Sequence, residues 1–153
     1  MRYRIALASV LTLAVASGSA MAYAKSTGNP EPKWGPAPAI FPAGAQMAVM
    51  QGDPSSTALF TVRLRMPDGY KIPPHVHPTD ENVTVLSGTF KVGMGKTFEQ
   101  KDMMTLTSTG FVTAPANMAH FALAQGQTIV QVHAMGPFAM TYVNPADTPK
   151  GAK

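Results

Sequence analysis

The sequence contains no cysteine, which excludes a disulfide, a thiolate metal site and a thiol nucleophile. It also lacks a Gly-x-Ser-x-Gly motif, so the nucleophile elbow of serine hydrolases is absent. Charged residues are sparse, at 13% of 153 residues, and neither sign forms a cluster. Without a basic stripe interleaved with aromatic residues, nucleic-acid binding is disfavoured. Any metal site in this chain must therefore use imidazole and carboxylate ligands.

The first 24 residues have the composition of a signal peptide. Arg2 and Arg4 give a positive start, an apolar run covers residues 5–16, and Ala-x-Ala sequences ending at Ala22 or Ala24 offer two cleavage sites. The apolar run is shorter than the roughly 20 residues that a membrane-spanning helix needs. We expect an exported protein, periplasmic or extracellular, with no membrane association after cleavage; an uncleaved membrane anchor is the alternative.

The rest of the chain is expected to form one domain flanked by irregular segments. Residues 25–45 are rich in proline and glycine and predict an N-terminal arm. This arm is either pinned to the domain or a neighbouring subunit by Trp34 and Phe41, or it is a flexible linker. Residues 46–143 are expected to form the domain, and residues 144–153 an irregular tail. No internal repeat is visible, which favours a single copy of the fold.

Alternation of apolar residues predicts short β-strands throughout the domain. In residues 57–66 every second side chain is apolar, as in a strand with one buried face. Ser87-Gly88 predicts a hairpin turn, and residues 95–104 a loop with a short helical turn. Further short strands are expected at residues 83–86, 89–94, 110–114, 121–124, 128–135 and 138–143. Many short strands separated by glycine or proline predict an all-β sandwich or barrel.

One stretch carries most of the residues that can hold a metal. His75 and His77 are two apart, so on an extended strand both imidazoles point to the same side. Glu81 follows after turn-forming residues that can bring the next strand alongside, with its carboxylate toward the histidines. Pro73-Pro74 favours a stiff, extended entry to the histidine strand. The two histidines and the carboxylate form a candidate chelating group.

This stretch resembles the first motif of the cupin superfamily, position by position. The matching positions are Gly69, His75, His77, Glu81 and Gly88. A second motif should follow after a short interval, and the segment from Gly110 through Pro115 to His120 supplies it.

The second motif departs from the family pattern in three ways. It has one residue fewer between Gly110 and Pro115, Asn117 where the family usually has glycine, and Ala124 where it often has asparagine. Asparagine is among the few residues that tolerate left-handed backbone geometry, so Asn117 suits the tight turn before His120.

The resemblance implies an all-β cupin β-barrel, the double-stranded β-helix or jelly roll, with His75, His77, Glu81 and His120 as metal ligands. The ion would be one divalent transition metal, with iron, manganese, nickel, copper, cobalt and zinc all compatible with this ligand set. The implied function is a metal-dependent, dioxygenase-like oxidoreductase acting on a small organic substrate, in which Glu81 also accepts a proton. The alternatives are a module that binds a small ligand or metal without turnover, and a purely structural metal site. Small cupins of this kind also often form homodimers.

Three further residues are candidates to line the cavity around the metal. Gln131 and His133 share the same side of their strand, and as a polar pair they could face the metal. The alternative for His133 is a hydrogen-bonded residue at the rim. Met118, two residues before His120, is the third candidate.

Overall fold

The computed structural model describes residues 31–152, and the part that begins at Glu31 forms one compact unit. The predicted signal peptide, residues 1–24, and the first part of the arm lie outside the described residues. Within the described part of the chain, no helix has the length and apolar character needed to cross a membrane.

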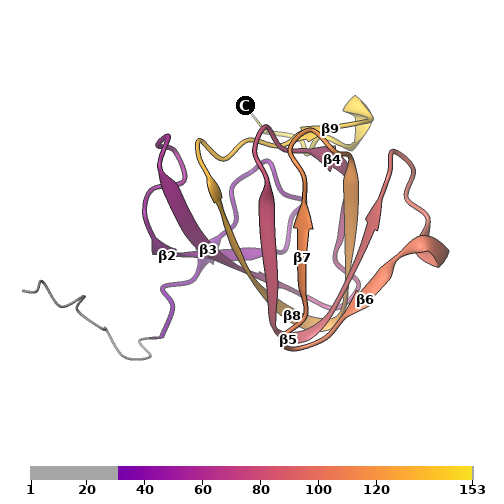
Figure 1. Cartoon of the computed structure of the whole chain (residues 1–153), viewed down its shortest axis with the longest axis horizontal. Coiled ribbons are helices and arrows are strands. Elements are labelled where there is room, and N and C mark those ends of the chain that lie inside the picture. Colours follow the sequence, from indigo (N-terminus) through magenta and orange to yellow (C-terminus); the bar gives the residue numbers. More distant parts are fainter. Residues whose placement is uncertain (1–30, 153) are drawn as a thin grey trace, which may run out of the picture. The chain divides into compact units, whose positions relative to one another are not determined.

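The described residues form nine strands in a single antiparallel sheet that curls into a half-barrel (Figure 1), which confirms the all-β prediction. A short 3-10 turn, Gln100–Asp102, lies in the loop where a helical turn was expected. The strands are β1 (Gly35–Pro36), β2 (Gln46–Gln51), β3 (Leu59–Met66), β4 (Lys71–Val76), β5 (Glu81–Met94), β6 (Met104–Leu106), β7 (Phe111–Ala114), β8 (His120–Met135) and β9 (Thr141–Tyr142).

The two longest strands, β5 and β8, organise the sheet. They pair antiparallel over almost their whole length, so Glu81 at the start of β5 lies beside Ala134, and Met94 at its end lies beside His120. Register shifts on both sides of Ser87 mark a bulge, which sharpens the bend of a strand. Because the paired strands curl, their opposite ends come together inside the half-barrel: a Glu81 carboxylate oxygen is 3.3 Å from His120 Nε2.

The buried face of the sheet is the one that sequence alternation predicts. On β3 the even-numbered side chains, from Phe60 to Met66, are 4% exposed or less. They join side chains of β5, β7 and β8 in one apolar cluster that fills the curl. At about 25 cal/mol for each Å² of apolar surface removed from water, this cluster is the main stabilising contribution to the fold.

The hairpin turn predicted at Ser87-Gly88 is wrong, because β5 runs through these residues without reversing. Gly88 has φ +80°, and a Cβ there would lie 2.4 Å from the carbonyl oxygen of Gln127. The glycine therefore serves the bulge, where the backbone of β5 closely approaches that of β8. The separate strands expected at 121–124 and 128–135 are likewise joined in β8, and within 138–143 only Thr141–Tyr142 is extended in the sheet.

Part of the proline-rich arm packs against the domain. Residues 37–45, called the strap below, are closed by a hydrogen bond from the Ala37 N–H to the Ala45 carbonyl. The hydroxyl of Tyr142 donates to the Ile40 carbonyl at 2.8 Å, and that of Tyr70 donates to the Pro42 carbonyl at 2.5 Å. Before the strap, the Trp34 ring lies 4.0 Å from the Arg65 guanidinium.

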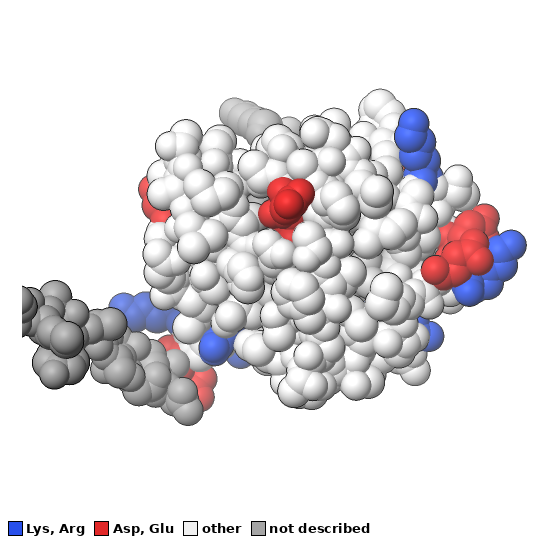
Figure 2. All heavy atoms as spheres, viewed as in Figure 1, with Lys and Arg blue, Asp and Glu red and all other residues white. Residues whose placement is uncertain are grey.

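The surface of the domain carries few charges, in keeping with the composition. On the face shown in Figure 2, basic side chains lie at the margins and form no continuous patch. This face therefore offers no electrostatic footprint for a nucleic-acid backbone.

Candidate metal centre

The structure brings three histidines of the two motifs together. His75 is on β4, His77 follows the end of β4, and His120 opens β8; each is 4% exposed or less. His75 pairs with His120 across the β4/β8 ladder, which places their ring centroids 4.2 Å apart. One ring nitrogen from each histidine lies within 4.8 Å of the others. The three histidines therefore cluster as a possible metal site.

Local backbone features explain why the histidines meet. Proline has no N–H to donate, and the β4/β8 register shifts between Ile72 and His75, across Pro73-Pro74. Asn117 has φ +61°, the left-handed conformation expected for the turn before His120. The Asn117 N–H also donates to the His77 carbonyl at 2.8 Å. The two motifs are thus joined by backbone hydrogen bonding as well as by the sheet.

Each imidazole is held through Nδ1 by a backbone carbonyl. His75 Nδ1 is 2.7 Å from the Pro73 oxygen, and His120 Nδ1 is 3.0 Å from the Met118 oxygen. His77 Nδ1 is 2.6 Å from the carbonyl of Ala139, which is distant in sequence. A carbonyl only accepts, so Nδ1 carries the proton and Nε2 keeps its lone pair.

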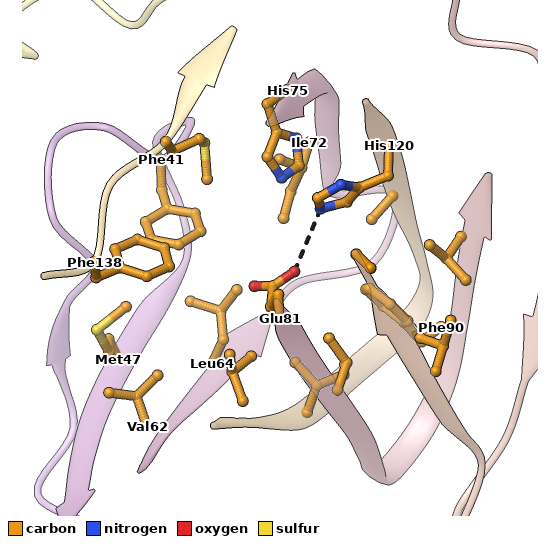
Figure 3. A pocket seen from close by; sticks show the side chains of 18 residues that line it. Phe41, Met47, Val62, Leu64, Ile72, His75, Glu81, Phe90, His120 and Phe138 are labelled. Carbon is orange, nitrogen blue, oxygen red and sulfur yellow. Dashed lines mark ion pairs between the residues drawn. The ribbon is translucent and has the colours of Figure 1, made fainter. Parts of the chain in front are cut away.

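Glu81 reaches two of the three rings. Its Oε2 is 3.3 Å from His120 Nε2 and 3.7 Å from His77 Nε2, and Figure 3 shows the carboxylate pointing at His120. Only the three imidazoles have ligand atoms that all lie within 4.8 Å of one another among the described residues. They form the core of the site, and the Glu81 carboxylate lies beside them.

Burial and neighbouring charges set the protonation of the site. Burial lowers the pKa of His75 to about 3, helped by repulsion from His120 and His77. Burial disfavours charge on His120 as well, but the interaction with the Glu81 carboxylate outweighs it and raises the pKa of His120. Burial opposes ionisation of Glu81, yet His120 and His77 outweigh this effect and lower its pKa. At neutral pH the site therefore holds a neutral His75 beside an ionised carboxylate.

His75, His120 and Glu81 line an apolar cavity (Figure 3), whereas His77 lies outside its lining. His75, Glu81 and His120 are the polar side chains among the described residues that line it, and the others are aliphatic, aromatic or methionine. Val83, two residues after Glu81 on β5, lines the cavity with it. The free space that water can reach inside is about 30 Å³. A single water needs roughly 10–15 Å³ on this measure, so the interior has room for about two or three.

The prediction that Gln131 and His133 face this cavity is wrong. The alternate residues Val130 and Val132 line it, so the polar pair projects from the opposite face of β8. There Gln131 accepts a hydrogen bond from the Arg63 Nε–H at 3.2 Å. Met118 does not line the cavity either, because its side chain is 46% exposed; only its carbonyl contributes, by holding His120.

Sequence reasoning missed the aromatic wall of the cavity. Phe41 from the strap and Phe138 stack with ring centroids 5.8 Å apart and planes within 10°, and both line the cavity together with Met140 (Figure 3). Phe138 also lies 5.1 Å from the His77 ring. The sequence signal for Phe41 was its expected role in pinning the arm; nothing in the sequence indicated Phe138.

The donor set fits a divalent transition metal. Nε2 of His77 and of His120 is buried without a hydrogen-bond partner, a costly state for a polar atom unless something binds it. Backbone carbonyls that accept from Nδ1–H, as they do at each of these histidines, commonly orient metal-bound imidazoles. Three imidazoles with an adjacent carboxylate suit first-row divalent ions, and ligand type alone does not select among them.

Comparison with known proteins agrees with this arrangement. The family model described as the ChrR cupin-like domain matches residues 31–139. A comparison with curated proteins gave no match.

Solved structures show the same fold. An RmlC-like cupin from Shewanella frigidimarina aligns with TM-score 0.51 and 17% identity, over 60% of this chain and 76% of its own. An oxalate oxidase aligns with TM-score 0.54 and 17% identity, over 70% of this chain and 59% of its own. The salicylate 1,2-dioxygenase of Pseudoaminobacter salicylatoxidans gives TM-score 0.53 and 14% identity, over 64% of this chain and 29% of its own. At these identities the likeness establishes the cupin fold alone.

Proposed function

The chain belongs to the ChrR cupin-like domain family, and on that premise we propose that it is an exported, metal-dependent oxidoreductase with dioxygenase-like chemistry on a small organic substrate. The observation that carries the proposal is the convergence of three buried imidazoles whose Nδ1 atoms are all held by carbonyls, which leaves Nε2 lone pairs for a metal. Solved proteins with this fold include an oxalate oxidase and a salicylate 1,2-dioxygenase, so the fold accommodates oxidative chemistry by analogy.

His75, His77 and His120 would hold the metal, with the Glu81 carboxylate as the adjoining oxygen ligand. When bound, a first-row divalent ion supplies an electrophilic centre that can polarise a substrate oxygen and bring it together with dioxygen. The chain itself provides the surroundings. Carbonyl contacts fix the imidazole orientations, and the apolar wall excludes water from the reacting centre.

Glu81 is the residue of the site suited to moving a proton. Its ionised carboxylate lies beside the imidazoles, with Oε2 3.3 Å from His120 Nε2, where it can accept a proton from a substrate hydroxyl held at the histidines. No second carboxylate is present among the described residues that line the cavity. A reaction that needs separate acid and base carboxylates is therefore not supported.

A second candidate function is capture of a small ligand or metal without turnover. The small interior space favours it, because a substrate larger than a few atoms cannot enter the cavity unless side chains move. The two functions separate in one assay: a substrate for the enzyme consumes dioxygen in the presence of the metal-loaded protein, whereas a captured ligand is recovered unchanged after saturable binding.

Substitution of a ligand tests the metal centre directly. His77→Ala removes one of the three converging nitrogens and should abolish stoichiometric metal content, measured by elemental analysis of protein folded in its own compartment. His133→Ala is the matched control, because His133 lies on the opposite face of β8 from the cavity wall. Full metal occupancy in His77→Ala would overturn the assignment. Loss of metal in His133→Ala as well would show a general folding effect.

A further inference from the structure

A groove on the surface leads toward the metal cavity. It is lined by the strap, by the turn that contains Pro54 and Ser55, and by residues 138–140. Its water-accessible space is about 580 Å³, far larger than the interior. Phe138 and Met140 line both the groove and the cavity, so these two side chains form the wall between them. We call this feature the entrance groove.

The wall between the groove and the cavity is made of side chains that can move. Methionine is unbranched and has three rotatable bonds, so Met140 can repack without strain on the backbone. Phe138 is only partly buried and is open to the groove on one side. A ligand in the groove can therefore reach the histidines by displacing two side chains, with the sheet left intact.

The chemistry of the path restricts what can follow it. Of the described residues that line the groove, Ser55 has the one polar side chain, and the cavity beyond adds His75, His120 and Glu81. No basic side chain lines either space, so a second charge on a ligand would lose its water without gaining a partner. Sugars and nucleotides would leave several polar groups unpaired for the same reason.

We propose that the ligand is a small, mostly apolar molecule with a single oxygen-bearing head group, such as a carboxylate, phenol or enol, which enters through the groove and stacks its body on Phe138. The head then reaches the histidine end of the cavity. Phe41 already stacks on Phe138, at 5.8 Å and 10°, so a ligand ring stacks there by taking the place of Phe41. The inference rests on the proposed metal centre and specifies its substrate class.

The test uses the signal-processed protein loaded with cobalt(II), whose visible absorption reports both metal binding and a change in its ligands. The probes are benzoate, 4-isopropylbenzoate and terephthalate, which share one carboxylate head. The second carboxylate of terephthalate and the isopropyl group of 4-isopropylbenzoate have the same branched shape at the same ring position, but only terephthalate carries a second charge. We expect 4-isopropylbenzoate to shift the cobalt spectrum saturably and terephthalate to bind at least about tenfold more weakly.

Phe138→Leu tests the entrance, because it keeps an apolar side chain and removes the aromatic face. It should weaken the binding of 4-isopropylbenzoate by about threefold to tenfold. The matched control is Phe111→Leu, since Phe111 is 54% exposed and lines neither space. The control should leave the affinity unchanged.

The outcomes separate this inference from the function on which it rests. If cobalt does not bind, the metal centre is wrong and the ligand class falls with it. If cobalt binds but terephthalate competes equally with 4-isopropylbenzoate, or no probe shifts the spectrum, the metal centre stands and the ligand class is overturned. Equal affinities in the Phe138→Leu and Phe111→Leu proteins would refute the stacking on Phe138.

Discussion

Removing the Phe41 ring should release the strap and destabilise the domain. Phe41 is 7% exposed, and its ring stacks on Phe138 inside the cavity wall. Phe→Ala at a buried site costs about 3–5 kcal/mol through lost transfer energy and the cavity left behind. Because a strap near the chain end can undock in place of leaving a void, we expect Phe41→Ala to cost about 3 kcal/mol, near the lower limit of this range.

The assay is thermal unfolding of the protein, followed by circular dichroism. A loss of about 3 kcal/mol in a domain of this size lowers Tm by roughly 10 °C, which is easily measured. Phe111→Ala is the control of the same residue type; with its ring 54% exposed, it should cost less than about 1 kcal/mol. Equal losses for the two variants would refute the argument, because Phe41 would then not be docked in solution.

A double-mutant cycle would resolve what Phe41 contacts. Phe41→Ala and Phe138→Ala should couple by about 0.5–1.5 kcal/mol, the range for an aromatic pair beyond its buried area. Additive losses would mean that each ring is stabilised by its other neighbours, such as Phe60, which meets Phe138 edge-on at 5.9 Å.

Two further predictions concern the histidine site. Asn117→Val should destabilise the protein by about 1–2 kcal/mol and lower its metal affinity, because a β-branched residue at φ +61° is strained and this turn positions His120. Asn117→Gly should preserve both stability and metal affinity. Urea unfolding measures the first effect and competition with a chelator the second; equal behaviour of the two variants would contradict the prediction. For the metal-free protein, stability should rise with pH between about 3 and 6.5, by up to about 5 kcal/mol, because the unfolded chain protonates His75 across this range while the folded protein keeps it neutral. The lowered pKa of Glu81 also makes the free energy of unfolding rise with pH. Urea midpoints measured at several pH values give the slope of stability against pH, and His75→Leu should flatten this slope.

Sequence spacing placed His75 and His77 together because their geometry is local: residues two apart on an extended chain point to the same side. The approach of Glu81 is not local, because β5 pairs with β6, β7 and β8 and not with β4, so the curl of the sheet brings the carboxylate to the histidines. Asn117 was predicted equally well, since a residue type that tolerates positive φ marks the turn it permits.

The failures occurred where tertiary pairing decides the outcome. A glycine with positive φ serves both hairpin turns and bulges, and only the approach of β8 distinguishes the two at Gly88. Strand parity correctly grouped Gln131 with His133 but did not say which face they share. The intervening Val130 and Val132 carried that information, because an alternating apolar set marks the core face.

The metal centre and the entrance are connected through one peptide segment. His75 and His120 are each held by the carbonyl two residues earlier in the chain, so their orientation is set locally. His77 is held by the carbonyl of Ala139, whose neighbours Phe138 and Met140 separate the cavity from the entrance groove. The His77 imidazole is oriented by its hydrogen bond to the Ala139 carbonyl, and a ligand that enters past Phe138 and Met140 moves the side chains on both sides of Ala139. In the proposed function, entry of a ligand past Phe138 and the orientation of the His77 imidazole are linked through this one peptide segment, although Phe138 is distant in sequence from both histidine motifs.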